Sequence, residues 1–316
     1  MTALGWPEPG IVRARPRWGW LRYPLPGSTQ ICWMGSLHPR LLAVLFLLEG
    51  PAEFGQALVA SLRHRDIELV VLRASWNAGH VYHYSVHALW ARIRERAGFL
   101  DAVHAGPADS RWNERQAALL RAVDELHTDL VIAAPTIARL RLLGLGDREL
   151  VEICFITAHY QLLGMLEESA GMPPEPLLGR PRSGRGAQPR RRRTGTRDRA
   201  PGLNGARPWT PGNAALAAHP PLRALLDWYG RTMARLSSLD AAAVIAALNF
   251  PADPDTPGFL RTAVTELDRE FFLSDEAWRE LLRYFDIRQI LEMCVLVGHY
   301  RTHEMIANTM ARARSL

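Results

Sequence analysis

Two long stretches of this chain carry the same helical pattern about 140 residues apart. In 149–166 and 289–310, apolar residues recur at intervals of three and four, which is the spacing of a buried helix face. At an offset of 140 the stretches also share identical residues: Glu152 and Glu292, Cys154 and Cys294, His159 and His299, Tyr160 and Tyr300, Met165 and Met305. A second match, at an offset of 141, joins 122–140 to 263–281. No run shows the sustained alternation of a strand, so the sequence predicts an all-α fold made of two copies of one helical unit.

An arginine-rich segment, 177–212, separates the two copies. It holds ten arginines, seven glycines and five prolines, a composition that cannot bury apolar area, so we expect a spacer. Around it we expect an N-terminal extension at 1–34, a first domain at 35–176 and a truncated second domain at 213–316. Residues 61–97 find no counterpart in the second copy. The segment's charge of +9 exceeds the +6 of the whole chain, so the rest is slightly acidic and nucleic-acid binding is not expected.

Composition excludes several kinds of chemistry. All 38 residues counted as Lys or Arg are arginines, which removes lysine Schiff bases and phosphate-loop lysines. Cys32, Cys154 and Cys294 lie far apart and offer neither a disulfide framework nor a zinc ribbon, as expected of a protein in the reducing cytoplasm. The apolar run Leu41–Leu48 is too short to span a membrane. We therefore expect a soluble cytoplasmic protein.

Three histidines cluster on one predicted helix. The pattern predicts a helix over about 66–76, a break at 77–79 and a second helix over about 80–94, on which His80, His83 and His87 share a face. Neutral imidazoles on one face are good ligands for first-row metals, and Glu68 on the preceding helix could complete a site of three histidines and one glutamate. The alternative is a solvated or mutually hydrogen-bonded histidine face.

The first half of the chain resembles the carboxymuconolactone decarboxylase family, which includes the alkyl hydroperoxidase D proteins. The resemblance spans about 38–166 and rests on HPRLLAVLF (38–46), RHRDIELVVLRAS (63–75), AGFLDAVHAGPADSRWNERQAALLRAVDELH (97–127), His87 and the His159-Tyr160 step. It implies an alkyl hydroperoxidase D-like helical bundle, duplicated here, and assembly into homo-oligomers.

The family's peroxidase branch carries a glutamate, eleven residues, a cysteine, two residues, a cysteine, three residues and a histidine. This chain keeps that frame as Glu68, His80, His83 and His87, with histidine in place of both cysteines. Peroxide reduction needs an attacking thiolate and a resolving thiol. Thiol peroxidase activity is therefore not expected.

The resemblance implies instead an enzyme that acts on a small aromatic, lactone or carbonyl substrate. Glu68 would be a general base or metal ligand and His87 an acid or ligand. Bound iron, copper, manganese or zinc would make the protein a metal-dependent oxidoreductase or lyase, with the metal held by Glu68, His80, His83 and His87. Trp76, Tyr82 and Tyr84 could wall the substrate pocket, although core packing explains them equally well. The alternative function is a binding or scaffolding protein that has lost its chemistry.

Other histidines favour structural roles. The repeated His159-Tyr160 and His299-Tyr300 steps are expected to pack and to form hydrogen bonds between helices, although His299 and His303 could hold a second metal. His38 and His127 are expected at the surface or at helix caps.

Overall fold

The structure is a computed structural model that describes residues 34–35, 37–53, 60–172, 203 and 207–316. Its helices are α2 (Pro39–Glu53), α4 (His64–Ala78), α5 (Val81–Arg94), α6 (Phe99–Ala105), α7 (Glu114–Asp129), α8 (Ala134–Leu142), α9 (Asp147–Ala170), the 3-10 helix η1 (Ala214–Ala218), α10 (Pro220–Leu236), α11 (Ala241–Asn249), α12 (Gly258–Glu270), α13 (Asp275–Leu281) and α14 (Ile287–Arg314). In this described part the only β pairing is an isolated bridge between Arg207 and Thr210. The predicted all-α class is confirmed.

The predicted break between the two site helices is also present. α4 ends at Gly79, whose φ of 74° lies in the left-handed region that favours glycine. His80 then precedes the first residue of α5 in extended conformation, so this histidine lies outside the helix that carries His83 and His87.

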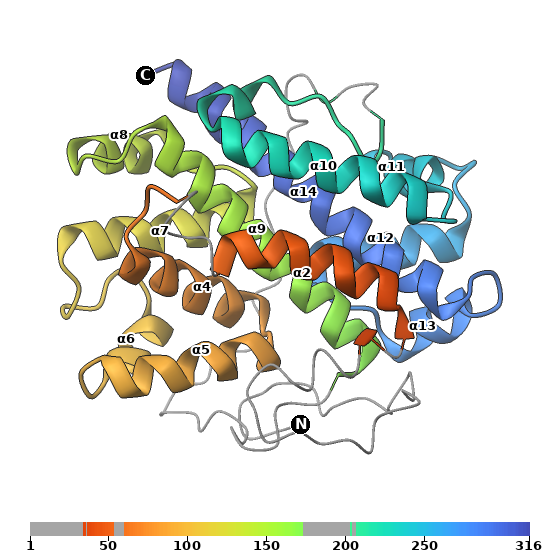
Figure 1. Ribbon diagram of the computed structural model, residues 1–316, viewed down its shortest axis with the longest axis horizontal. Helices are drawn as coiled ribbons and strands as arrows, with labels where there is room; N and C mark the ends of the chain where they lie inside the picture. The colour runs from red at the N-terminus through yellow and green to blue at the C-terminus, as the bar shows by residue number, and fades with distance from the viewer. Residues whose placement is uncertain (1–33, 36, 54–59, 173–202, 204–206) are drawn as a thin grey trace.

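α9 and α14 form the centre of the molecule (Figure 1). Both are buried along almost their whole length, because elements from both halves of the chain cover them. The two helices approach closely at Gly298, where an added Cβ would lie 2.5 Å from the Cβ of Leu162. A side chain at position 298 would push α9 and α14 apart.

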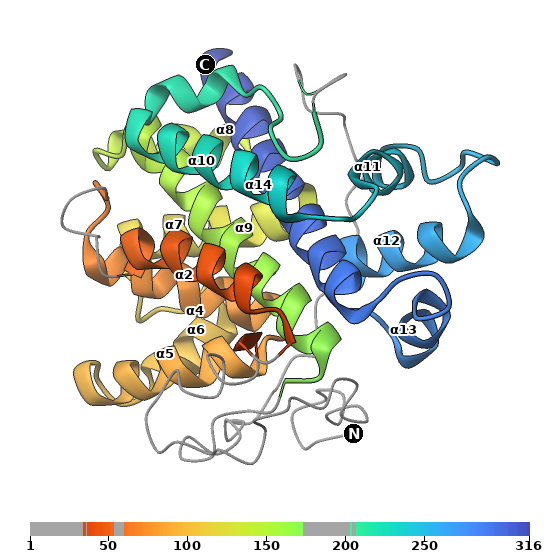
Figure 2. The same ribbon diagram turned by 45° about the vertical axis from the view of Figure 1, so that its right-hand side comes forward.

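The two halves exchange a pair of buried hydrogen bonds. His38, just before α2, lies with its Nε2 2.9 Å from Oε1 of Glu292 on α14. His219, just before α10, lies with its Nε2 2.9 Å from Oε1 of Glu152 on α9. Each histidine thus reaches the central helix of the other half, which holds α2 and α10 side by side over the core (Figures 1 and 2).

The same two glutamates fix the starts of the next helices. Glu152 accepts hydrogen bonds from the amides of Ser61 and Leu62, just before α4. Glu292 accepts from the Ser237 hydroxyl and the Ser238 amide, just before α11. The start of α11 is therefore bound to Glu292 as the start of α4 is bound to Glu152. The sequence alone does not show this correspondence, because 61–97 has no recognisable counterpart in the second copy.

Further crossed contacts join the ends of the central helices to the opposite half. The Thr309 hydroxyl accepts a hydrogen bond from the Ile132 amide at 3.1 Å, and the Ser169 hydroxyl accepts one from the Leu273 amide at 2.9 Å. The two halves therefore interlock through reciprocal polar contacts and share one apolar core.

Two histidines expected at the surface are buried. His38 is 5% exposed; its Nδ1 accepts the Leu41 amide as a helix cap, and its other nitrogen faces Glu292. His127 is 1% exposed and stacks on the Phe271 ring at 4.8 Å. The expected surface or cap position is confirmed for His38 as a cap, although the residue is buried, and it is wrong for His127, which stacks on a ring more than 100 residues away.

Several sequence expectations lie outside the described residues. These are the N-terminal extension apart from Met34, nearly all of the arginine-rich spacer, and Cys32. Within the described ranges, no helix combines the length and apolar character that a membrane crossing requires.

The crossed glutamates predict a measurable stability effect. We expect Glu152→Gln to lower the free energy of unfolding at pH 7 by about 2 kcal/mol, because His219 and two buried amides lose a charged acceptor. Urea denaturation measures the change. The control Glu114→Gln removes a carboxylate that is 67% exposed and paired with Arg139, and should change stability by less than about 1 kcal/mol.

The effect of Glu152→Gln should also depend on pH. Burial acts to raise the Glu152 pKa, but hydrogen bonds from His219, Ser61 and Leu62 outweigh it and hold the pKa below its ordinary 4.5. The carboxylate therefore stabilises the fold above pH 4.5, and this contribution is lost as the pH falls through the native pKa. A difference between wild type and variant that does not shrink in acid would contradict this assignment.

Candidate functional site

Three helices bring together a carboxylate, an imidazole and a phenol. Oε2 of Glu68 on α4 lies 3.1 Å from Nδ1 of His87 on α5. Nε2 of the same ring lies 3.1 Å from the hydroxyl of Tyr160 on α9. The three side chains form a continuous hydrogen-bonded chain, and they join the two residues that the sequence predicted as an acid–base pair.

One protonation pattern satisfies both hydrogen bonds. With its proton on Nδ1, the His87 ring donates to the Glu68 carboxylate, and an Nε2 without a proton accepts from the Tyr160 hydroxyl. The assignment follows from the partners, since a carboxylate can only accept. This is the order of groups in which a carboxylate orients an imidazole that in turn accepts a hydroxyl proton.

The charge at the outer end of this chain is fixed by His87. Burial acts to raise the pKa of Glu68, but the hydrogen bond with His87, helped by the positive charge of Arg94, lowers it below its ordinary value. Glu68 is therefore ionised at neutral pH. Its side chain is 23% exposed, that of His87 is 10% exposed, and Tyr160 is 5% exposed, so the chain runs from solvent into the interior.

A second buried pair lies beside the first. Nε2 of His83 lies 2.8 Å from Oε1 of Glu167, and the His83 ring meets the Tyr160 ring edge-on at 5.4 Å. The next residue, Glu168, accepts a hydrogen bond from the Val81 amide at 3.1 Å. These two glutamates of α9 hold the first turn of α5, where carboxylates also complement the helix dipole.

His80 occupies a space left by a glycine. It is fully buried against α9, where a Cβ added at Gly164 would lie 1.7 Å from Nε2 of the ring. Any side chain at position 164 would take the place of the imidazole.

The three histidines share a neighbour but do not converge. All three contact α9, as a common face predicts, yet His87 meets Tyr160, His83 meets Glu167 and His80 meets Gly164. Both ring nitrogens of His87 are already engaged. In the described ranges, no group of three or more His, Cys, Asp or Glu side chains is placed to hold a metal ion. The four residues do not fit a metal in this arrangement, so metal binding stays a prediction of the sequence.

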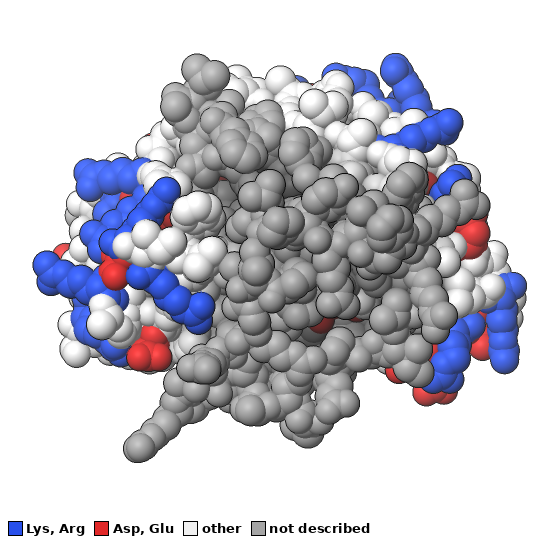
Figure 3. Space-filling view, turned by 60° about the horizontal axis from the view of Figure 1, so that its bottom comes forward, with Lys and Arg blue, Asp and Glu red and all other residues white. Residues whose placement is uncertain are grey.

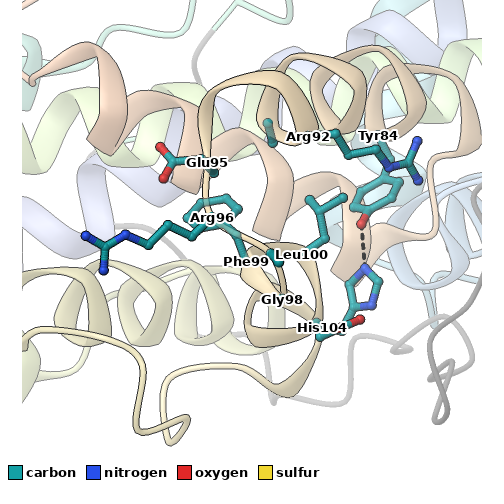
Figure 4. A pocket seen from close by; sticks show the side chains of 11 residues that line it. Tyr84, Arg92, Glu95, Arg96, Gly98, Phe99, Leu100 and His104 are labelled. Carbon is teal, nitrogen blue, oxygen red and sulfur yellow. Dashed lines mark hydrogen bonds between the residues drawn. The ribbon is translucent and has the colours of Figure 1, made fainter.

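The three predicted substrate-binding aromatics separate into two places. Tyr84 lines a pocket of about 380 Å³, and its hydroxyl hydrogen-bonds to Nε2 of His104 (Figure 4). Trp76 lies behind that contact, stacked on the His104 ring at 3.7 Å. Tyr82 lies instead against His83. A single aromatic wall is therefore not formed.

The sequence predicted that Tyr160 packs and forms hydrogen bonds between helices, as it does with His87, but it did not predict this partner or the role of Glu167. The sequence does hold a signal for both: Glu167 and Glu168 directly follow the apolar stretch 162–166, and Tyr160 precedes Glu167 by seven residues, so that both share one helix face.

The matching residues of α14 have different surroundings. Nε2 of His299 lies 3.1 Å from the carbonyl oxygen of Trp209, and the Tyr300 hydroxyl accepts a hydrogen bond from Asn249 at 3.3 Å. Burial lowers the pKa of His299 to about 4 and that of His303 well below its ordinary value, so both rings are neutral. A helical carboxylate and imidazole pair like Glu68 and His87 is not seen at Tyr300 within the described residues.

Comparison of the chain with protein-family models, curated proteins and solved structures finds no match.

The fit of His80 against Gly164 predicts a specific cost. We expect Gly164→Ala to lower the free energy of unfolding by about 2 kcal/mol, because the added methyl group displaces a buried ring. This exceeds the gain of about 1 kcal/mol that alanine normally brings inside a helix. Urea denaturation provides the measurement. Gly212→Ala, where an added Cβ meets no atom within 4 Å, is the matched control. Equal stability of the two variants would show that His80 does not lie on Gly164.

Proposed function

We propose that this protein is an enzyme that transfers protons to and from a small carbonyl, lactone or aromatic compound. The observation that carries the proposal is the hydrogen-bonded chain Glu68–His87–Tyr160, which has one end in water and the other in the protein interior. A chain of titratable groups in this order suits general acid–base catalysis, because each member can pass a proton to the next.

In the proposed reaction, the Tyr160 oxygen takes a proton from the substrate as its own proton moves to Nε2 of His87. The imidazolium that forms is stabilised by the ionised Glu68 carboxylate. The substrate is left as an enolate or carbanion, and the reverse transfer returns the proton to another atom. In a decarboxylation, the electron pair of the broken C–C bond would stay on the substrate carbon as carbon dioxide departs, this carbanion would take the proton of the Tyr160 hydroxyl, and solvent would return a proton to Tyr160 through His87.

We also propose that the two halves are copies of one alkyl hydroperoxidase D-like unit, of which the first carries the site. The crossed His–Glu pairs and the crossed Ser/Thr contacts support this, since each contact has a partner at the matching position of the other half. Leu130 and Phe271, 141 residues apart, share a left-handed φ of 60° and 62°.

A second candidate function is a scaffold without catalysis, and it is favoured by the interlocked halves. Such a protein would need the crossed contacts but not the proton chain. The two candidates therefore differ in what they expect of Tyr160.

The proposal predicts a loss of turnover in Tyr160→Phe. We expect 4-carboxymuconolactone or a β-keto acid to exchange C–H protons or lose carbon dioxide, followed by ¹H NMR in D₂O. Tyr160→Phe should slow the reaction by about 100-fold, because general acid–base groups contribute at least that much. The control is Tyr300→Phe, which removes the hydroxyl at the matching position of α14 and should leave the rate unchanged.

The pH profile provides a second test. Wild-type activity should fall as the pH drops through the lowered pKa of Glu68, since protonation removes the charge that holds His87. Glu68→Gln should be slow at every pH and lose this acid limb. ¹⁵N NMR of His87 should show its proton on Nδ1. Absence of turnover with every compound, with that tautomer intact, would favour the scaffold.

A further inference from the structure

A pocket separate from the proton chain opens where α5 turns into α6. Its volume is about 380 Å³, within the range of small-molecule sites. Ala91, Phe99 and Leu100 give it an apolar lining, and Arg92 and Arg96 stand at its rim. Figure 4 shows Arg92 beside Tyr84 at one end of the pocket and Arg96 at the other, with Phe99 and Leu100 between them.

The pocket is held open by a fixed backbone. Gly98 turns the chain between the two helices with a φ of 80°, and its carbonyl oxygen accepts a hydrogen bond from Arg111 at 2.6 Å. The buried Arg73 binds Asp124 through two nitrogens and donates through its third to the carbonyl oxygens of Val103 and His104. Both ends of α6 are therefore tied down before any ligand arrives.

The charges at the rim favour an anion. Arg92 and Arg96 are exposed, and within the described ranges neither side chain has an ion pair or hydrogen bond. Glu95 is already paired with Arg65 at 2.6 Å, which leaves two guanidinium groups against the single carboxylate of Asp101. Figure 3 shows arginine side chains gathered at the end of the molecule where Figure 1 places α5 and α6.

The inner wall of the pocket is polar but uncharged. Burial lowers the pKa of His104 to about 4 and raises that of Tyr84 above its ordinary value, so both are neutral at pH 7. Their hydrogen bond is backed by the stacked Trp76 ring. An anion at the rim thus meets no buried negative charge in this wall.

We propose that this pocket binds a small monocarboxylate with an aromatic or apolar body. The carboxylate lies against one of the two rim arginines, whose guanidinium group can form two parallel hydrogen bonds with it, and the body lies on Phe99 and Leu100. The site stands independently of the proton chain, because it shares none of the residues Glu68, His87 and Tyr160.

Benzoate is the probe, and its binding to the full-length protein is measured by isothermal titration calorimetry. Saturable binding is expected, about tenfold stronger than that of benzyl alcohol, which lacks the charge. The double variant Arg92→Gln/Arg96→Gln should weaken benzoate binding about tenfold and leave benzyl alcohol unchanged. The control Arg231→Gln removes one charge on α10 and should leave both affinities unchanged.

A further variant separates the pocket from general charge attraction. Leu100→Trp fills the apolar space and should abolish binding of both probes while the circular dichroism spectrum and the urea midpoint stay near those of wild type. Equal binding of benzoate and benzyl alcohol, unchanged benzoate binding in the double arginine variant, or no saturable binding to the wild-type protein would each overturn the proposal. These outcomes are independent of the activity test with Tyr160→Phe, because the pocket and the proton chain share no residue.

Discussion

A buried carboxylate on an apolar helix must find hydrogen-bond donors, and this requirement organises the molecule. Glu152 and Glu292 are buried in the core, and each accepts hydrogen bonds from a histidine of the other half and from the residues just before a helix of its own half. Unpaired, each charge would cost several kcal/mol. Because their donors come from four segments, satisfying two side chains fixes α2, α4, α10 and α11 at once. The position of Glu68, about one turn into α4, follows from that anchorage.

α9 then connects the fold to the site. One end of this helix holds Glu152, while Tyr160, Gly164 and Glu167 further along determine where the three histidines lie. The same helix packs on α14 through the contact of Leu162 with Gly298. A change that moves α9 against α14 therefore also moves the Tyr160 hydroxyl relative to His87. The stability of the interlocked halves and the geometry of the proton chain are not independent quantities in this protein.

The sequence predicted what depends on local pattern. Apolar spacing predicted several of the helices, Gly79 marked the end of α4, and the spacing of His83 and His87 put these two residues on one face of α5, whereas His80 lies just outside that helix. The sequence did not predict the contact partners of these residues. Hydrophobic periodicity indicates which face of a helix a residue occupies, but not which residue of another helix packs against that face. The expected metal site required three imidazole rings to point at one ion. Instead, each ring lies against a different residue of α9, more than 70 residues away: His87 against Tyr160, His80 against Gly164 and His83 against Glu167. His38 was expected at the surface or at a helix cap, and it does cap α2, but its partner Glu292 is 254 residues away.

The two halves differ most where chemistry is proposed. Both the proton chain and the pocket depend on α5 and α6, which follow α4, whereas α11 is followed directly by α12. The central helices show the consequence: at the position of Gly164, α14 carries Glu304, which pairs with the buried Arg301. A glutamate there leaves no space for a ring like that of His80, and the adjoining His303 is neutral through burial. The second half thus supplies Glu292 and Thr309 to position the first, and α14 is adapted to packing at the point where α9 is adapted to receive histidines.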